Sequence, residues 1–84
     1  MTIEHISRLL AVARMVQRPG SRTAAQMVDE MEVSLRTLMR DLNTLREEWG
    51  LPIEYDRKTN TYTADREGCR RAILEIFGLE EFDD

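Results

Sequence analysis

Two helix-start signals, only eleven residues apart, most constrain the fold of this chain. Thr23 is followed three residues later by Gln26, the T-x-x-Q form of a capping box, and Ser34 offers a second N-cap just after the apolar Val33. Between these caps there is space only for a short helix that ends near Met31 and a sharp turn. We therefore expect a short helix, a turn of about three residues and a longer helix in immediate succession.

The longer helix, predicted over residues 34–49, has an apolar side and a polar side. Four large apolar residues at +4, +3, +4 spacing form one inward stripe: Leu38, Leu42, Leu45 and Trp49. The opposite side and its flank carry Arg36, Thr37, Arg40, Asn43 and Thr44. Asp41 falls at the edge of the apolar stripe, where we expect a cap or an ion pair within the fold. Gly50 and Pro52 predict the end of this helix.

Regular patterns also predict the structure of the segments before and after these two helices. Apolar residues at i, i+3 and i+4 spacing predict a helix over residues 3–18, which Pro19-Gly20 ends. Alternating residues over 53–64 predict two short strands, joined by a loop in which Asn60 tolerates the left-handed conformation. Asp65 is a possible cap of a fourth helix that ends near Gly78.

These elements predict a mainly α fold with a small β-hairpin. Their order, a three-helix core, a two-stranded wing and a C-terminal helix, is that of a winged helix-turn-helix. We assign residues 1–64 to a winged helix-turn-helix domain. Residues 65–84 form a C-terminal helix and an acidic tail that could serve dimerisation or partner binding.

The net charge of −4 is concentrated near the C-terminus. Five of the sixteen acidic residues lie in residues 75–84, which hold no Lys or Arg, so residues 1–74 carry twelve basic against eleven acidic side chains. Eleven of the twelve basic residues are Arg, whose planar fork suits phosphate and guanine. Composition alone is equally compatible with arginines scattered over a solvated surface.

Several classes of protein are not indicated by the sequence. No apolar run approaches the roughly 20 residues of a membrane span, and no signal-peptide layout opens the chain. Cys69 is the only cysteine, so neither an internal disulfide nor a cysteine-based zinc site is expected. We expect a cytoplasmic protein with no metal and no cofactor that is not an enzyme.

The turn and the longer helix carry a resemblance to a known family. Residues 31–45, MEVSLRTLMRDLNTL, resemble the signature L-G-V-S-x-R-T-[VIL]-x-R-D-[IL]-x-x-L of DeoR-type and WYL-domain transcriptional regulators. The matching positions are Val33, Ser34, Arg36, Thr37, Leu38, Arg40, Asp41, Leu42 and Leu45. The resemblance extends from about Ile6 to Ala64. Glu32 replaces the usual Gly, so the turn is expected to form without a residue that readily takes positive φ.

The resemblance implies a bacterial transcription factor that binds double-stranded DNA sequence-specifically. It implies that Ser34, Arg36, Thr37 and Arg40 face DNA and that Asp41 holds the helix in place. The family continues into a WYL ligand-sensing domain, whereas this sequence ends at Asp84, so we expect a regulator without that sensor.

Docking of such a fold places residues 34–49 in the major groove and the wing, residues 53–64, on the phosphate backbone. Arg36 is the preferred base reader, while Arg40, Thr37 and Thr23 are expected on phosphates. Tyr62 is expected in the wing core, with its hydroxyl near a phosphate. The full set of candidate DNA contacts is Arg22, Thr23, Ser34, Arg36, Thr37, Arg40, Asn43, Thr44, Arg57, Lys58 and Tyr62.

The fourth helix leaves two alternatives open. Its apolar residues are Cys69, Ile73, Ile76 and Phe77, and Cys69 is expected to be a small buried residue rather than a nucleophile. This face either covers the first helix or pairs with its copy in a homodimer.

A different function is also compatible with the sequence. A winged helix that binds a separate protein partner, and not DNA, is favoured by the net charge of −4, the pI of 5.0 and Glu32 near the supposed groove face. The acidic tail, with Leu79 and Phe82, could then bind a basic partner. An intermediate possibility is that the tail competes with DNA for the arginines.

Overall fold

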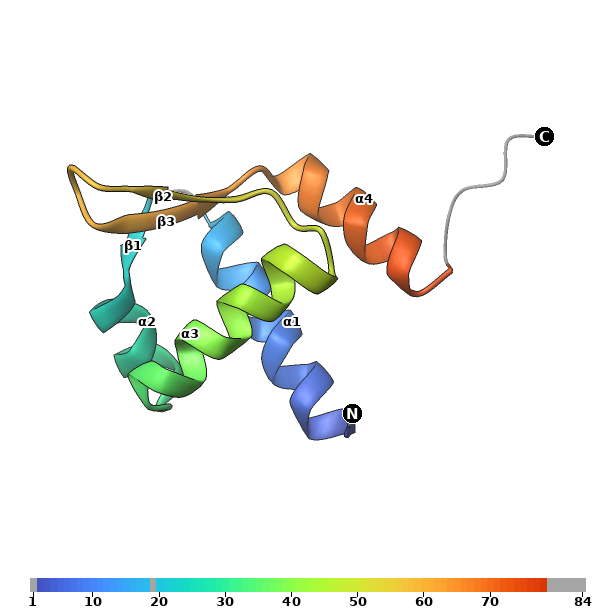
Figure 1. Ribbon diagram of the computed structural model, residues 1–84, viewed down its shortest axis with the longest axis horizontal. Helices are drawn as coiled ribbons and strands as arrows, with labels where there is room; N and C mark the ends of the chain where they lie inside the picture. Colours follow the sequence, from blue (N-terminus) through green and yellow to red (C-terminus); the bar gives the residue numbers. More distant parts are fainter. Residues whose placement is uncertain (1, 19, 79–84) are drawn as a thin grey trace.

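The computed structural model describes residues 2–18 and 20–78, and the fold class is as predicted: mainly helical with a small antiparallel sheet (Figure 1). The elements are α1 (Ile3–Gln17), β1 (Arg22–Thr23), α2 (Ala24–Met31), α3 (Leu35–Asn43), the π-helix η1 (Thr44–Glu48), β2 (Ile53–Asp56), β3 (Thr61–Ala64) and α4 (Arg66–Ile76). None of the helices in these two ranges is long and apolar enough to cross a membrane.

The predicted N-caps are confirmed. The Thr23 hydroxyl accepts a hydrogen bond from the backbone N–H of Gln26, and the Gln26 side chain accepts one from the backbone N–H of Thr23 at 2.9 Å, which completes the capping box of α2. The side chains of Ser34 and Asp65 cap α3 and α4 in the same manner. Each cap satisfies backbone groups that the first helical turn leaves unpaired.

The turn between α2 and α3 contains a residue in a backbone conformation that residues with a Cβ disfavour. Glu32 adopts the left-handed region, with φ 54° and ψ 42°, and its backbone N–H donates to the carbonyl of Val28. The turn is therefore made, as expected, without a residue that readily takes positive φ, and Glu32 itself adopts the left-handed conformation. Glycine adopts this conformation without steric cost, whereas a residue with a Cβ is strained there.

Glu32→Gly should raise the free energy of unfolding by about 1 kcal/mol, because it removes the Cβ from a left-handed residue. Urea denaturation followed by circular dichroism measures the change. Asp29→Gly is the matched control: Asp29 is exposed within α2, so glycine there should lower stability. Equal destabilisation by both substitutions would contradict the role of the turn.

The sheet has three strands where the sequence predicted two. β2 and β3 form the expected hairpin, called the wing below (residues 53–64), and β1 adds a short strand on the other side of β3, which gives the order β1-β3-β2. Arg22 pairs with Tyr62 and Thr23 with Thr61. A strand of two residues is too short to show alternation, so no local pattern could have predicted it. At the wing tip, Asn60 adopts positive φ as expected, and its side chain accepts a hydrogen bond from the Tyr55 hydroxyl at 2.7 Å.

The predicted continuous helix over residues 34–49 changes type partway. α3 ends at Asn43 and η1 follows, in which the backbone N–H of Trp49 donates to the carbonyl of Thr44 at 3.1 Å, five residues earlier. The predicted inward stripe is nevertheless confirmed, because Leu38, Leu42, Leu45 and Trp49 are all buried.

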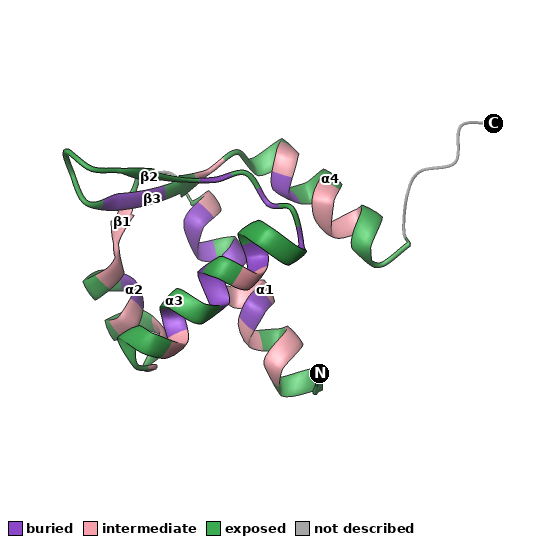
Figure 2. Cartoon of the chain, in the orientation of Figure 1, coloured by how far each residue is buried: buried purple, intermediate pink, exposed green. Residues whose placement is uncertain are grey.

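The core lies between α1, α2, α3 and the sheet. Figure 2 shows buried segments on the inner sides of α1, α3 and β3. The buried hydrophobic residues are Leu9, Val12, Ala13, Met15, Val16, Met27, Leu38, Leu42, Leu45, Trp49, Leu51, Ile53, Tyr62 and Cys69. This packing leaves the outer side of α3 at the surface.

α4 is only partly packed on this core, and it extends away from the wing tip (Figure 1). Cys69 is fully buried in the core of its own chain, as predicted. It therefore has no exposed surface for the interface to which it was also assigned. Burial raises the pKa of its thiol. Ile73 is half-buried, and Ile76 and Phe77 are exposed although the Phe77 ring packs edge-on against Trp49 at 5.8 Å. Leu79 and Phe82 of the acidic tail lie outside the described residues.

Candidate nucleic-acid interface

The outer side of α3 carries two arginines whose side chains pair with no other group in the described part of the chain. Arg36 and Arg40 are exposed and lie one helical turn apart, so their side chains leave the same side of the helix. Within residues 2–18 and 20–78, neither side chain has a hydrogen bond or an ion pair. Asn43 is exposed on the same side, and Thr44 is half-buried where η1 begins.

The N-terminal end of α3 borders these arginines. The Ser34 hydroxyl accepts from the backbone N–H of Thr37 at 3.1 Å and donates to the Thr37 hydroxyl at 3.0 Å. Ser34 is exposed and Thr37 is half-buried. The N-terminal end of a helix carries a partial positive charge and favours a nearby anion such as a phosphate.

The wing tip carries the other two exposed cations of the candidate set. The loop at residues 57–60 places Arg57 and Lys58 at the end of the molecule opposite to α4, where α2 and the start of α3 also lie (Figure 1). The Asp56 carboxylate accepts from the backbone N–H of Lys58 at 2.9 Å, which fixes the loop and leaves the Lys58 ammonium free of partners among the described residues.

Three further candidates make contacts within the chain. Arg22 Nε lies 3.3 Å from the Glu30 carboxylate, and Thr23 caps α2. Tyr62 is buried in the wing core as predicted, and its hydroxyl donates to Met39 Sδ at 3.8 Å. These three side chains therefore support the candidate DNA-binding surface through contacts within the chain.

Asp41 anchors the inner side of α3 to α1. Its carboxylate is fully buried and accepts from Arg8 Nε at 2.6 Å and from Arg8 Nη2 at 3.0 Å, which confirms the predicted ion pair. This hydrogen bonding raises the pKa of the Arg8 guanidinium above its ordinary value. His5 Nε2 is 3.7 Å from the same carboxylate. The bidentate contact fixes the rotation of α3 about its axis, and hence the direction of Arg36 and Arg40.

A sequence model of the HTH domain matches residues 8–62, the segment from the second turn of α1 to the middle of β3. The chain belongs to the HTH domain family. No curated protein and no solved structure matches the chain.

The family membership gives the geometry a context. HTH domains bind double-stranded DNA through the second helix of the motif, which is α3 in this chain. The HTH match indicates a DNA-binding regulator and covers both partners of the Arg8–Asp41 pair and all eleven candidate DNA contacts. The four apolar candidates on α4 lie outside it.

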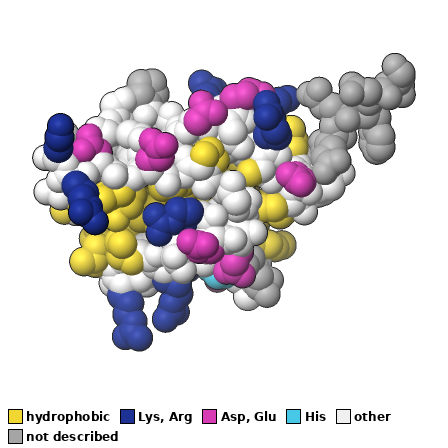
Figure 3. Space-filling view, turned by 45° about the horizontal axis from the view of Figure 1, so that its top comes forward, with side chains coloured by type: hydrophobic (Ala, Val, Ile, Leu, Met, Phe, Trp, Pro, Cys, Tyr) yellow, Lys and Arg dark blue, Asp and Glu magenta, His cyan; other side chains and the backbone are white. Residues whose placement is uncertain are grey.

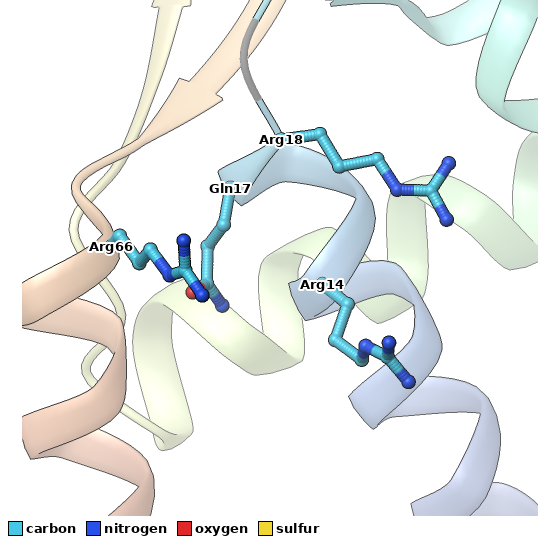
Figure 4. Close-up of a pocket in the computed structure, with 4 residues that line it drawn as sticks. All are labelled: Arg14, Gln17, Arg18 and Arg66. Atoms are coloured by element: carbon cyan, nitrogen blue, oxygen red, sulfur yellow. The ribbon is translucent and has the colours of Figure 1, made fainter.

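A second group of arginines, from α1 and α4, does not converge. Arg14, Arg18 and Arg66 line a hollow of about 200 Å³ together with Gln17. Arg66 extends toward Gln17, whereas Arg14 and Arg18 extend to the other side of α1 (Figure 4). Arg18 also lies 4.0 Å from the Glu30 carboxylate. The hollow therefore does not bring its three charges to one ligand position.

Leu35 and Met39 are surface residues of α3 that the sequence analysis did not single out. They are 54% and 42% exposed and lie next to each other on the outer side of the helix, which makes them a small exposed apolar patch. Their signal was present in the sequence, since both are apolar residues outside the stripe of Leu38 and Leu42.

Proposed function

We propose that this HTH domain is a bacterial, DeoR-type regulator of transcription that binds double-stranded DNA sequence-specifically. Residues 34–49 enter the major groove and the wing follows the phosphate backbone. The observation that carries the proposal is the exposure of Arg36 and Arg40 on α3, without partners among the described residues. A surface held in this orientation by a buried ion pair is suited to a polyanionic ligand.

The roles of the side chains follow from their positions. Arg36 is the second residue of α3, and N-terminal residues of such a helix contact base edges, so Arg36 reads guanine through two hydrogen bonds. Arg40, one turn later, contacts phosphate together with Ser34 and Thr37. Asn43 and Thr44 extend the same contact surface, and Arg57 and Lys58 contact the backbone beside the groove.

The proposal is tested by selection of bound sequences from a random duplex pool. With phosphate contacts from Arg40, Arg57 and Lys58, the plot of log affinity against log salt should have a slope of about −2.7. Arg40→Ala should weaken binding to all duplexes alike and make this slope less steep by about one. Fluorescence anisotropy at several salt concentrations measures both quantities. Absence of any enriched duplex at low salt would contradict the function.

The exposed residues of α4 support a homodimer as part of the proposal. Ile76 and Phe77, continued by the half-buried Ile73, offer an apolar face to a second copy. A two-fold dimer would bind two half-sites about 10 bp apart or a multiple of this distance, so the enriched motif should be palindromic. Light scattering that gives a monomer at tens of micromolar would contradict the dimer.

The second candidate function is a module that docks a protein partner and does not bind DNA. The net charge of −4 favours it, because the overall field repels DNA, and Glu32 is exposed beside α3. Residues 65–84 would then contribute the partner-binding element. Failure to bind duplex at low salt, together with loss of partner binding on removal of Leu79 and Phe82, would identify this function.

A further inference from the structure

Next to the two free arginines of α3 lies a row of exposed apolar side chains. Leu35 immediately precedes Arg36, and Met39 immediately precedes Arg40, so the two rows run side by side along the helix. Leu35 and Met39 keep 54% and 42% of their surface exposed. A surface that binds only phosphate groups would gain nothing from exposed apolar side chains beside its arginines.

The exposed apolar side chains of α3 are followed by aromatic side chains of the wing. The Tyr62 hydroxyl contacts Met39 Sδ at 3.8 Å, and the Tyr62 ring lies 4.8 Å from the ring of Tyr55, which is itself exposed. In the space-filling view, hydrophobic side chains gather on the side of the molecule that carries the wing, with Lys and Arg side chains around them (Figure 3). We call Leu35 and Met39 the apolar row.

Duplex DNA offers one apolar group to a helix in the major groove, the C5-methyl group of thymine. A leucine near the start of such a helix is placed to cover this methyl group, while the neighbouring arginine spans the acceptors of guanine. Arg36 and Arg40, unpaired among the described residues, favour an anionic occupant of this surface, and the HTH match over residues 8–62 favours DNA over an acidic protein.

We propose that the apolar row, Leu35 above all, contacts thymine methyl groups and makes thymine a required base beside the guanine contacted by Arg36. This inference rests on the proposed function. It assigns Leu35 as a specificity-determining residue, with Met39, which contacts Tyr62 of the wing, as the second member. The recognised sequence therefore contains adjacent guanine and thymine rather than guanine alone.

The test removes single methyl groups from the duplex. The motif enriched by the full chain from a random pool should hold thymine beside guanine. Replacement of that thymine by deoxyuridine, which lacks only the methyl group, should weaken binding about fourfold for each methyl that is covered. With the Leu35→Ala variant, the same replacement should change affinity by less than about twofold.

Ile3→Ala is the matched control, because Ile3 is an exposed apolar residue on α1, away from α3. This variant should keep the full deoxyuridine effect. Leu35 is more than half exposed and alanine has the highest helix propensity, so the Leu35→Ala variant should keep an unfolding midpoint close to that of the wild type.

Two results would overturn the inference while the proposed function stands. One is duplex binding that depends on Arg36 but has no enriched thymine, which would leave the apolar row for a protein partner. The other is an undiminished deoxyuridine effect in Leu35→Ala. Failure of the wild-type chain to bind any duplex would instead overturn the proposed function, and the inference with it.

Discussion

Arg8→Met should lower the free energy of unfolding by about 3 kcal/mol. The reason is the carboxylate of Asp41, which is fully buried and loses both guanidinium hydrogen bonds. The Arg8 side chain is 33% exposed, so the lower end of the range for broken buried pairs applies. Guanidinium chloride denaturation followed by Trp49 fluorescence measures the change.

The double variant Arg8→Met, Asp41→Ala distinguishes charge from packing. Removal of the buried carboxylate as well should restore stability to within about 1 kcal/mol of the wild type, because no unpaired charge remains. Arg46→Met is the matched control, since Arg46 is exposed beside Glu47 and should change stability by less than about 0.5 kcal/mol. A double variant as unstable as Arg8→Met would show that the aliphatic part of Arg8 matters more than its charge.

The contribution of Arg8 does not depend on pH near neutrality. Its pKa is raised in the folded chain, so the stabilisation is complete below the unfolded pKa and is lost only as pH rises through the higher folded pKa, in strongly alkaline solution. Between pH 6 and 8, roughly, the ionisation of Arg8 itself should therefore contribute no change to the free energy of unfolding.

Arg36→Ala should weaken binding to the enriched duplex by about 30-fold, within the range of 1 to 3 kcal/mol that one bidentate arginine–guanine contact contributes. The loss should be confined to duplexes that keep the contacted guanine, because binding to other sequences never includes this contact. Competition with duplexes changed at one base pair each, followed by anisotropy, measures it. Arg36 is exposed without partners among the described residues, so the variant should keep its unfolding midpoint.

Two variants serve as controls for this prediction. Arg36→Lys keeps the charge but not the planar fork, so it should retain affinity for phosphate and lose most of the preference for guanine. Arg71→Ala removes an exposed arginine of α4, outside the matched HTH segment, and should leave sequence preference unchanged. An equal loss on all duplexes for Arg36→Ala would mean that Arg36 contacts phosphate instead of a base.

The features that sequence predicted correctly are local. The caps at Thr23, Ser34 and Asp65 each depend on atoms within three residues along the chain, and the buried stripe of residues 34–49 depends on helical spacing alone. Glu32 shows the limit of this reasoning: a glutamate does not readily take positive φ, yet Glu32 adopts φ 54° in the turn that joins the two helices. Context prevailed over local preference.

The features that sequence did not predict join distant residues. The partner of Asp41 lies 33 positions away, and nothing in the pattern of α1 distinguishes Arg8 from Arg14, the other arginine of that helix. The pairing of Arg22 with Glu30 likewise requires the packing of β1 beside α2. The sequence therefore predicted Arg22 as a candidate DNA contact but not its ion pair with Glu30.

The short strand β1 links the wing to the helices, the two parts that we propose contact DNA. Its residue Thr23 pairs with Thr61 of the wing and is also the N-cap of α2. The wing is therefore joined directly to the helices, with no flexible segment between Thr23 and α2. A preorganised binding surface loses little conformational entropy on association. In the proposed complex, the distance between α3 in the groove and the wing on the backbone would thus be set before the encounter, and we expect a duplex of unsuitable groove width to be rejected by its shape rather than by its base sequence.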